Sequence, residues 1–448
     1  MMNNKSIIAI AIVAVIIVAG AGVYLVLGNN GSEKVDPADE TTRLNICGNA
    51  NLDNYLDDKD IQYIQDIIDG KEAKTILADA NNDGKIDQKD IDQVKALMNF
   101  TAQSRWYLDI NDKIACVKGD INSVAIQYWP TLQAFMAVGA EDLIKYADTG
   151  ALSTANSGQY GQRIANMGIQ SFGSGFHSSY DFETMLAIGV DAIVCGSAEI
   201  YFIGIEDRFT PGTEINMIRL PFWEKANVAS SYITLAYLLN DKDYVDQAYE
   251  YLDFVTEIQD LINERTKNVE QKTVLVNYYS AGSSALEVEV ECRGSGSYEC
   301  STIANLYNLA SDIPGGLSSS TMYYQTDVEY IMSKDPDYIL MLHGSGLAKT
   351  EADQKTAFDK WTAYLKDTTA YKNHGIMVSG SGLMSGLFQT NLALLIACQV
   401  YADEFKDIDG YDYLQEMIDR FTPINEGKTP GSAGYFDVTK NGAYLYVG

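Results

Sequence analysis

A segment of fifteen residues near the middle of the chain is repeated, without a gap, in its second half. The copies, residues 180–194 and 326–340, are identical at four aligned positions: Asp181 and Asp327, Glu183 and Glu329, Asp191 and Asp337, and Ile193 and Ile339. Each copy has the pattern of a short helix, a turn and a buried strand. Because the repeated unit contains both a helix and a strand, the chain is expected to fold as two similar α/β lobes.

A long helical pattern lies between the two halves. From Asp241 to about Lys267, apolar residues recur at helical spacing and share one face. The pattern predicts a helix of roughly 27 residues, about 40 Å long. Buried strands are predicted around it at 124–128, 192–195 and 273–278. One long helix between two similar lobes would form a stiff hinge, with a cleft between the lobes.

The first 30 residues predict a membrane anchor. An uncharged apolar run from Ile7 to Leu27 is long enough to cross the ~30 Å hydrocarbon layer as a helix. Lys5 precedes the run and acidic residues follow it, so the positive-inside rule places the rest of the chain outside the membrane. A cleaved signal peptide is the alternative, because residues 19–22 are small. We expect a single-pass protein of the cell membrane whose bulk is extracytoplasmic.

Charge and cysteine content limit the classes of function. The chain of 448 residues has a formal net charge of −29, which argues against nucleic-acid binding because phosphate neutralisation requires clustered Lys and Arg. Six cysteines are too few for a disulfide scaffold at this length. Four of them lie among apolar neighbours and are expected to be free thiols. Cys292 and Cys300 flank a Gly/Ser-rich loop, where either a disulfide or two free thiols would fit.

Two twelve-residue loops near the N-terminus have the spacing of calcium-binding loops. Both place oxygen-bearing side chains at positions 1, 3, 5, 9 and 12, and the backbone carbonyl of position 7 adds a further oxygen. Gly84 allows the sharp turn at position 6 of the second loop, and Asn54 replaces it in the first because Asn tolerates a positive φ. We expect two bound Ca²⁺ ions. The predicted ligands are Asn49, Asn51, Asp53, Tyr55, Asp57 and Asp60, and Asp79, Asn81, Asp83, Lys85, Asp87 and Asp90.

An amphipathic helix is predicted after each loop, at 61–68 and at 91–98. Paired loops that end in Asp at position 12, each followed by a single helix, resemble a dockerin domain over residues 44–100. The resemblance implies a cohesin module as a candidate partner. A cohesin would bind through positions 10 and 11 of the loops, which are Asp58, Lys59, Gln88 and Lys89.

The repeated segment carries a second resemblance. It matches the N-x-E-x-(I/L)-L-x-L-x-P-D-L-(V/I) segment present in each lobe of class III periplasmic binding proteins, those for siderophores, haem and cobalamin. Residues 377–401 look like that family's closing strand and final helix, and the resemblance spans about 113–405. It implies two Rossmann-like lobes joined by one long helix, an ABC permease and ATPase as partners, and no enzymatic activity. The implied ligand is an iron–siderophore, haem or corrinoid chelate.

The same resemblance implies a docking role for two glutamates. In that family, a glutamate at the outer tip of each lobe engages arginines of the permease, and the aligned positions here are Glu183 and Glu329. Carboxylates on both lobes could address both permease subunits through charge-assisted bonds. For Glu329 a structural role is the alternative, since Thr326 and Glu329 have the spacing of a capping box.

Ligand-binding residues are expected where strands end and helices begin. Aromatic rings there would stack on a large chelate or macrocycle, and an arginine would pair with an anionic one. The candidates are Tyr128, Trp129, His177, Tyr180, Ser197, Tyr201 and Trp223 from the first lobe, and Tyr279, Arg293 and His343 from the second.

The expected organisation combines an α/β two-lobed body with a small all-α module. In chain order it comprises an anchor at 1–30, a linker at 31–43, the dockerin-like domain at 44–100, a lobe at 105–240, the spanning helix at 241–268, a lobe at 269–420, and a tail with a β-hairpin at 421–448. The alternative function is a dockerin-mediated cell-surface interaction protein whose lobes sense a ligand or adhere. A hydrolase is disfavoured because the sequence has no G-x-S-x-G, HExxH or phosphate-loop motif.

Overall fold

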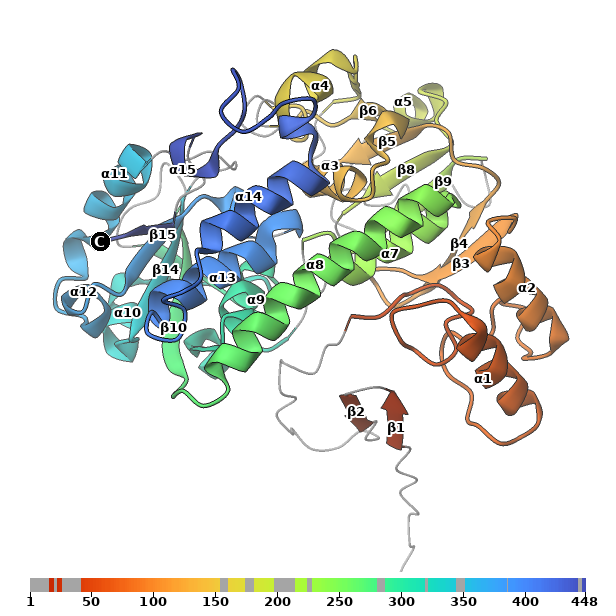
Figure 1. Cartoon of the computed structure of the whole chain (residues 1–448), viewed down its shortest axis with the longest axis horizontal. Coiled ribbons are helices and arrows are strands. Elements are labelled where there is room, and N and C mark those ends of the chain that lie inside the picture. The colour runs from red at the N-terminus through yellow and green to blue at the C-terminus, as the bar shows by residue number, and fades with distance from the viewer. Residues whose placement is uncertain are drawn as a thin grey trace, which may run out of the picture.

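Two α/β lobes lie on either side of a long diagonal helix, and a small helical module lies beside the N-terminal lobe (Figure 1). The structure is a computed structural model of the whole chain. It describes residues 42–153, 160–173, 181–196, 214–223, 228–279, 287–318, 321–343, 351–384, 386–441 and 445–448. Before residue 42 it describes the backbone of two short strands, β1 (Ile16–Ala19) and β2 (Gly22–Leu25).

The N-terminal lobe is built on a parallel sheet. Strands β5 and β8 are buried at every position, as expected for strands covered on both faces. Helices α3 (Trp129–Ala137) and α7 (Val228–Leu239) share a core with one face, and α5 (Phe182–Ala187) covers the other. The described strands follow the order β7 (Gln170–Ser171), β6 (Ile144–Ala147), β5 (Val124–Gln127), β8 (Ala192–Cys195) and β9 (Asn216–Arg219).

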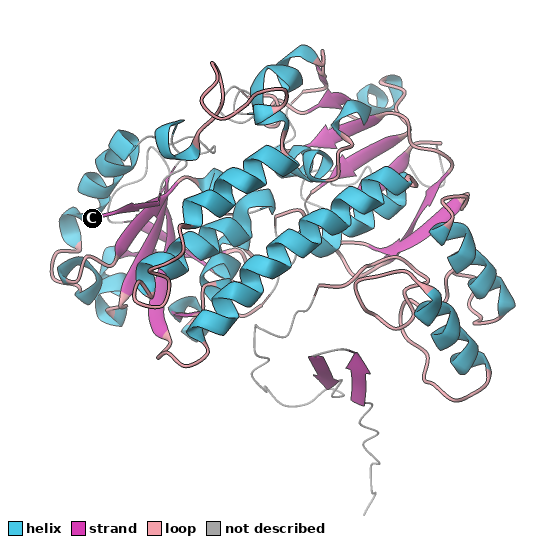
Figure 2. Ribbon diagram, in the orientation of Figure 1, coloured by secondary structure: helices cyan, strands magenta, loops and turns pink. Residues whose placement is uncertain are grey.

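The C-terminal lobe has a larger, mixed sheet (Figure 2). Helices α9 (Gly296–Ile303) and α13 (Gln389–Val400) lie on one side of it, and α10 (Val328–Lys334) and α11 (Glu351–Trp361) on the other. The described strands follow the order β13 (Tyr323–Asp327), β11 (Glu287–Glu291), β10 (Lys272–Tyr279), β14 (Tyr338–His343), β15 (Ile376–Ser379) and β16 (Leu445–Val447), and β12 (Leu306–Asn308) also pairs with β10.

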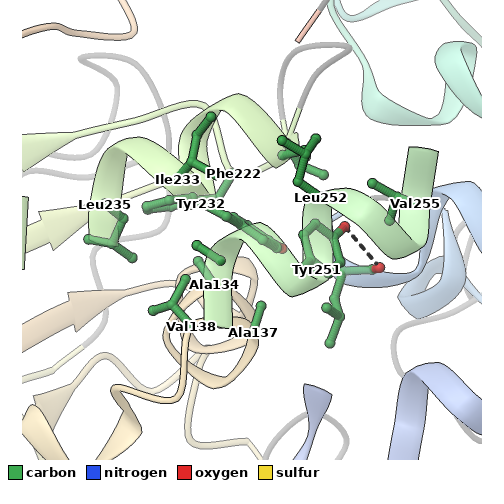
Figure 3. Packing of buried hydrophobic residues seen from close by; sticks show 14 of the residues in the cluster. Ala134, Ala137, Val138, Phe222, Tyr232, Ile233, Leu235, Tyr251, Leu252 and Val255 are labelled. Atoms are coloured by element: carbon green, nitrogen blue, oxygen red, sulfur yellow. Dashed lines mark hydrogen bonds between the residues drawn. The ribbon is translucent and has the colours of Figure 1, made fainter. Parts of the chain in front are cut away.

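The predicted spanning helix is confirmed as α8 (Lys242–Thr266). Asp241 caps its N-terminus by accepting a hydrogen bond from the Asp243 N–H. Figure 3 shows the apolar face of this helix packed on α7 and α3 of the N-terminal lobe. The Tyr251 hydroxyl also donates to the Leu387 carbonyl of the C-terminal lobe at 3.2 Å. The helix therefore contacts both lobes.

The sequence repeat corresponds to a structural repeat in separate sheets. The first copy forms α5 and β8 in the N-terminal lobe, and the second forms α10 and β14 in the C-terminal lobe. Asp191 accepts hydrogen bonds from the Asn122 N–H and the Ser123 hydroxyl at 2.8 and 3.0 Å. Asp337 accepts from the N–H and hydroxyl of Thr273 at 2.9 and 2.8 Å. Each aspartate thus joins the start of its own strand to the start of the lobe's central strand.

The helical module contains the two predicted helices, α1 (Asp58–Ile68) and α2 (Gln88–Met98). It leads into an antiparallel pair, β3 (Ser104–Leu108) and β4 (Ile114–Lys118). Arg105 on β3 is fully buried, and its guanidinium donates to the carbonyls of Leu238, Ala102 and Gly119 at 2.9, 2.9 and 2.6 Å. This one side chain ties the module to the N-terminal lobe.

The tail does not form the predicted hairpin. Helix α14 (Gly410–Phe421) is followed by a short helix, α15 (Val438–Asn441), where we expected the first hairpin strand. Strand β16 pairs antiparallel with β15 instead. It extends the sheet beyond β15, whose outer edge would otherwise expose unpaired backbone groups.

The N-terminal segment and the cysteines also bear on the sequence predictions. Within the apolar run, β1 and β2 form an antiparallel pair, and the other residues of the predicted anchor lie outside the described residues. In the described parts of the chain, no helix is long and apolar enough to cross a membrane. All six cysteines are free thiols, so Cys292 and Cys300 are not bonded.

Candidate functional site

Three aromatic residues meet at the carboxyl end of the N-terminal sheet. The Tyr128 ring contacts Trp129 and Trp223 edge-on, with ring centroids 5.7 Å apart in both pairs. Burial raises the pKa of the Tyr128 phenol to about 12, so its hydroxyl stays protonated at neutral pH. The indole N–H of Trp223 is buried and finds no hydrogen-bond acceptor among the described residues.

Tyr128 has a strained backbone. Its φ of 68° and ψ of 152° lie in a region that is almost restricted to glycine. The strain arises where β5 ends and α3 begins at once with Trp129 and Pro130. Such a conformation costs about 1–3 kcal/mol and persists where the surrounding structure imposes it, most often at ligand sites.

The C-terminal lobe contributes Tyr278 and Glu291 to the same region. Besides burial, the Tyr278 phenol of the C-terminal lobe contributes to the raised pKa of Tyr128. Glu291 is buried on β11, the strand that pairs with β10 beside Tyr278, and it accepts a hydrogen bond from the Ser297 hydroxyl at 3.1 Å. Burial raises the pKa of its carboxyl to about 7. The site therefore combines aromatic surface with one carboxyl that titrates near neutral pH.

The lobes touch directly beside this region. The Gln133 side chain on α3 accepts a hydrogen bond from the Leu387 N–H at 3.4 Å and donates to the Tyr160 hydroxyl at 2.8 Å. A Cβ atom on Gly386 would come within 2.4 Å of the Gln133 carbonyl oxygen, and the glycine has a φ of 66°. Glycine is required at this position for both reasons.

The structure describes three of the remaining predicted ligand residues, all in the C-terminal lobe. Arg293 follows β11 and is half-buried, and His343 ends β14 and is also half-buried. The backbone of Tyr279 pairs with that of His343. The other four candidates lie outside the described residues: His177, Tyr180, Ser197 and Tyr201.

Glu183 and Glu329 are both exposed, each in the first turn of its helix. The helix caps are the preceding aspartates of the repeat. Asp181 accepts from the Thr184 N–H at 2.8 Å, and Asp327 accepts from the Tyr330 N–H at 3.0 Å. The capping box expected between Thr326 and Glu329 is therefore wrong, because the N-cap is one residue later.

The two calcium-type loops share the hydrogen bonds made by the carboxylate at position 12. At position 12, Asp60 and Asp90 are fully buried, and each accepts from the N–H of position 3 at 3.2 Å. Each also accepts from the N–H of position 9, at 2.9 Å in the first loop and 2.8 Å in the second. Each carboxylate thus joins positions 3 and 9 of its loop. Burial raises the pKa of Asp60 to about 7. A cation would offset the cost of burying these charges.

The position-1 residue of the first loop fits a cation ligand. Asn49 is fully buried, and its Nδ2 donates to the carbonyls of Leu44 and Asp53 at 2.6 and 2.7 Å. Its Oδ1 is buried and accepts no hydrogen bond from the described residues. Among all the residues that the structure describes, there is no group of three or more His, Cys, Asp or Glu side chains that could hold a metal ion. The predicted oxygen set of each loop also includes an Asn side chain and a backbone carbonyl, which are not members of such a group.

No protein-family model and no curated protein matches the chain. Among solved structures, it is similar to the TroA-like periplasmic binding protein FepB from Veillonella parvula, with 18% identity and a TM-score of 0.54, over 71% of this chain and 96% of that one. CeuE from Helicobacter pylori in a Ni-His complex is similar with 15% identity and a TM-score of 0.52, over 72% and 97% of the chains. The molybdate-binding protein MolA from Haemophilus influenzae has 14% identity and a TM-score of 0.51, over 71% and 97%. The fold is that of TroA-like periplasmic binding proteins.

The candidate residues differ in how visible they are in the sequence. Tyr128, Trp129 and Trp223 follow strands, which is why the rule that ligands bind at strand ends selects them as candidates. Tyr278 lies within β10 and Glu291 at the end of β11, an alternating Glu-Val-Glu-Val-Glu strand that looks solvent-exposed. Ser295 and Ser297, small polar residues at the start of α9, are the sequence feature that could have indicated a buried carboxylate nearby.

Proposed function

We propose that this protein is the extracytoplasmic solute-binding component of an ABC importer, and that it captures a metal chelate of the iron–siderophore, haem or corrinoid class. The observation that carries the proposal is the TroA-like two-lobed fold, with three aromatic residues gathered where strands of the N-terminal lobe end. A fold with two lobes and a helical connection suits capture and release rather than covalent chemistry.

The aromatic side chains at the strand ends of the N-terminal lobe support a large, partly aromatic or apolar ligand. Tyr128, Trp129 and Trp223 offer ring surface, and the Trp223 N–H offers a hydrogen bond to a ligand oxygen. A bare transition-metal ion is less suited as the ligand beside Tyr128, because no group of three or more His, Cys, Asp or Glu side chains that could hold a metal ion is found among the described residues.

Ligand class is tested by exposing the purified chain to ferric hydroxamates, ferric catecholates, haem, cobalamin, Ni²⁺ and molybdate. Native mass spectrometry and absorbance should show a one-to-one complex with one chelate. Trp223→Ala should weaken that complex. Trp361→Ala is the control for stability, because Trp361 is buried on α11 in a hydrophobic cluster of the C-terminal lobe that does not include the candidate site. Binding of molybdate or Ni²⁺ alone would reject the chelate class, and binding of none would reject the importer function.

Permease docking is assigned to Glu183 and Glu329 on the lobe tips. The support is that both are exposed on equivalent helices and that neither caps its helix. A Glu183→Ala/Glu329→Ala variant should bind ligand normally and lose uptake. The matched control, Glu257→Ala/Glu264→Ala on α8, should retain uptake. Normal uptake by the first variant would reject the docking role.

The N-terminal region completes the proposal. The apolar run before residue 28 would hold the protein at the cell membrane, and the loops of the module would bind two Ca²⁺ ions. Asn49 Oδ1 and the buried Asp60 and Asp90 support the calcium sites. Positions 10 and 11 of both loops are exposed, so a cohesin-type partner could reach them: Asp58, Lys59, Gln88 and Lys89.

A further inference from the structure

The two calcium-type loops differ in what surrounds them. In the second loop, the carboxylate of Asp79 closes the turn by accepting from the N–H groups of Asp83 and Gly84 at 3.1 and 2.8 Å. Gly84 at position 6 has a φ of 86°, which suits glycine. The second loop therefore holds its own shape, and its positions 4 to 7 are exposed.

The first loop lacks both devices. Asn54 occupies position 6 and does not take the positive φ that we expected from its sequence position. The side-chain N–H groups of Asn49 donate to the carbonyls of Leu44 and Asp53. Its Oδ1 accepts no hydrogen bond from the N–H groups of the turn, in contrast to Asp79 in the second loop. The peptide between positions 6 and 7 must be held by something else, because the position-7 carbonyl of Tyr55 is a calcium ligand.

The spanning helix supplies that support. The Tyr249 hydroxyl on α8 donates to the Asn54 carbonyl at 3.0 Å. The Tyr249 ring also stacks on the Tyr55 ring, with centroids 4.9 Å apart and an angle of 16° between the planes. Both groups of the turn, the position-6 carbonyl and the position-7 side chain, thus contact one residue of the helix that joins the lobes.

Tyr249 is itself fixed by its neighbours. Tyr237 on α7 lies close enough to contribute to the raised pKa of the Tyr249 phenol, whose main cause is burial. The Tyr237 ring stacks on Phe100 at 6.2 Å, and the Asn240 side chain donates to the Phe100 carbonyl at 3.2 Å. The first loop of the module therefore contacts Tyr249 on α8, and the end of the module at Phe100 contacts Tyr237 on α7.

We propose that Tyr249 positions the first calcium loop, so that this site is complete only while the module is docked on α8. The inference rests on the calcium binding proposed above. Because coupling between two events is reciprocal, Ca²⁺ in the first loop stabilises the docked module and the spanning helix in return. The second loop is independent of the lobes. The pair thus comprises one autonomous site and one site that links calcium to the ligand-binding body.

The test uses the full chain with Asp83→Ala, which disables the second loop and leaves the first to be titrated alone. Isothermal titration with Ca²⁺ should show one site, and Tyr249→Phe should weaken it by roughly 10- to 100-fold, as for other residues that orient metal ligands. Tyr249→Phe keeps the ring stack, so the fold is retained. Tyr413→Phe is the control and should leave the affinity unchanged. Tyr413 is on α14, and its ring contacts Phe254 of α8, the helix that carries Tyr249.

The reverse arrangement tests independence. With Asp53→Ala in the first loop, Tyr249→Phe should leave the Ca²⁺ affinity of the second loop unchanged. Equal first-loop affinities with and without the Tyr249 hydroxyl would overturn the inference while leaving the calcium sites in place. A wild-type chain that takes up no Ca²⁺ would overturn both, and the two failures are therefore distinguishable.

Discussion

Glu291 is a carboxylate buried where β11 ends and α9 is about to begin. The Ser297 hydroxyl donates to it, and Ser295 caps the helix beside it by accepting from the Ser297 N–H. These bonds favour the ionised form, yet desolvation dominates and raises its pKa to about 7, with a smaller contribution from Glu289. The residue is therefore half-charged at neutral pH, at a point close to the region where the lobes meet.

Replacing Glu291 with Gln should remove a pH-dependent cost. The folded chain binds this proton more tightly than the unfolded chain between pH 4.5 and about 7, so the residue's contribution to stability falls as the pH rises through that window and is constant above it. Glu291→Gln should thus raise the free energy of unfolding, relative to wild type, by about 1–3 kcal/mol more at pH 8 than at pH 5. Urea unfolding at both pH values measures this. The exposed control Glu257→Gln should show no such difference, and equal effects at both pH values would disprove the assignment.

At the scale of elements, the repeat was the most informative part of the sequence. Its spacing predicted a helix and a strand in each lobe, and β8 was predicted with its observed bounds. The role of its aspartates was not predictable, because their partners at Ser123 and Thr273 lie more than 60 residues away in the sequence. The tail shows the converse limit. Asn441-Gly442 is a strong local turn signal, but the open edge of β15 decides where the last strand pairs.

Asp337→Ala should destabilise the C-terminal lobe by about 1–3 kcal/mol, because the N–H and hydroxyl of Thr273 lose their acceptor at the start of the central strand. Asp191→Ala should have a similar effect through Ser123 in the other lobe. Chemical denaturation measures both changes. Asp359→Ala, which removes an exposed pair with Lys355 on α11, should cost less than about 0.5 kcal/mol. An Asp337 variant no less stable than this control would contradict the structural role.

At the scale of the whole molecule, the module is part of the body. A continuous hydrophobic core includes Leu44 of the module, Tyr251 of α8 and Val438 of the tail. The sequence predicted the module's two helices, but it treated the module as a separate domain. The contacts that join it to the lobes, such as that from Tyr249 to Asn54, connect residues 195 positions apart. No periodicity or local motif reports contacts at that distance.

The tail also crosses between the lobes. After α14, which packs on α13 and α8, the chain reaches the N-terminal lobe at Glu426 and returns to the C-terminal sheet as β16. Arg163, on the short helix at Gly161–Asn166, donates to Glu426 at 2.6 Å and also pairs with the buried Glu141 at 3.1 Å. One guanidinium therefore joins the tail to a buried carboxylate of the first lobe.

Arg163→Met should release the tail from the N-terminal lobe. The variant keeps an apolar stem of similar length but leaves Glu141, whose pKa is already raised by burial, without its counter-charge. We expect a loss of about 1–3 kcal/mol in the free energy of unfolding, together with faster amide hydrogen exchange in residues 423–441. Arg265→Met is the matched control, since its partner Asp407 is exposed and an exposed pair contributes about 0–1 kcal/mol. The prediction is contradicted if hydrogen exchange in the tail is unchanged and Arg163→Met is as stable as Arg265→Met. In that case the apolar contacts with α14 alone hold the tail, and the ion pairs of Arg163 do not couple it to the N-terminal lobe.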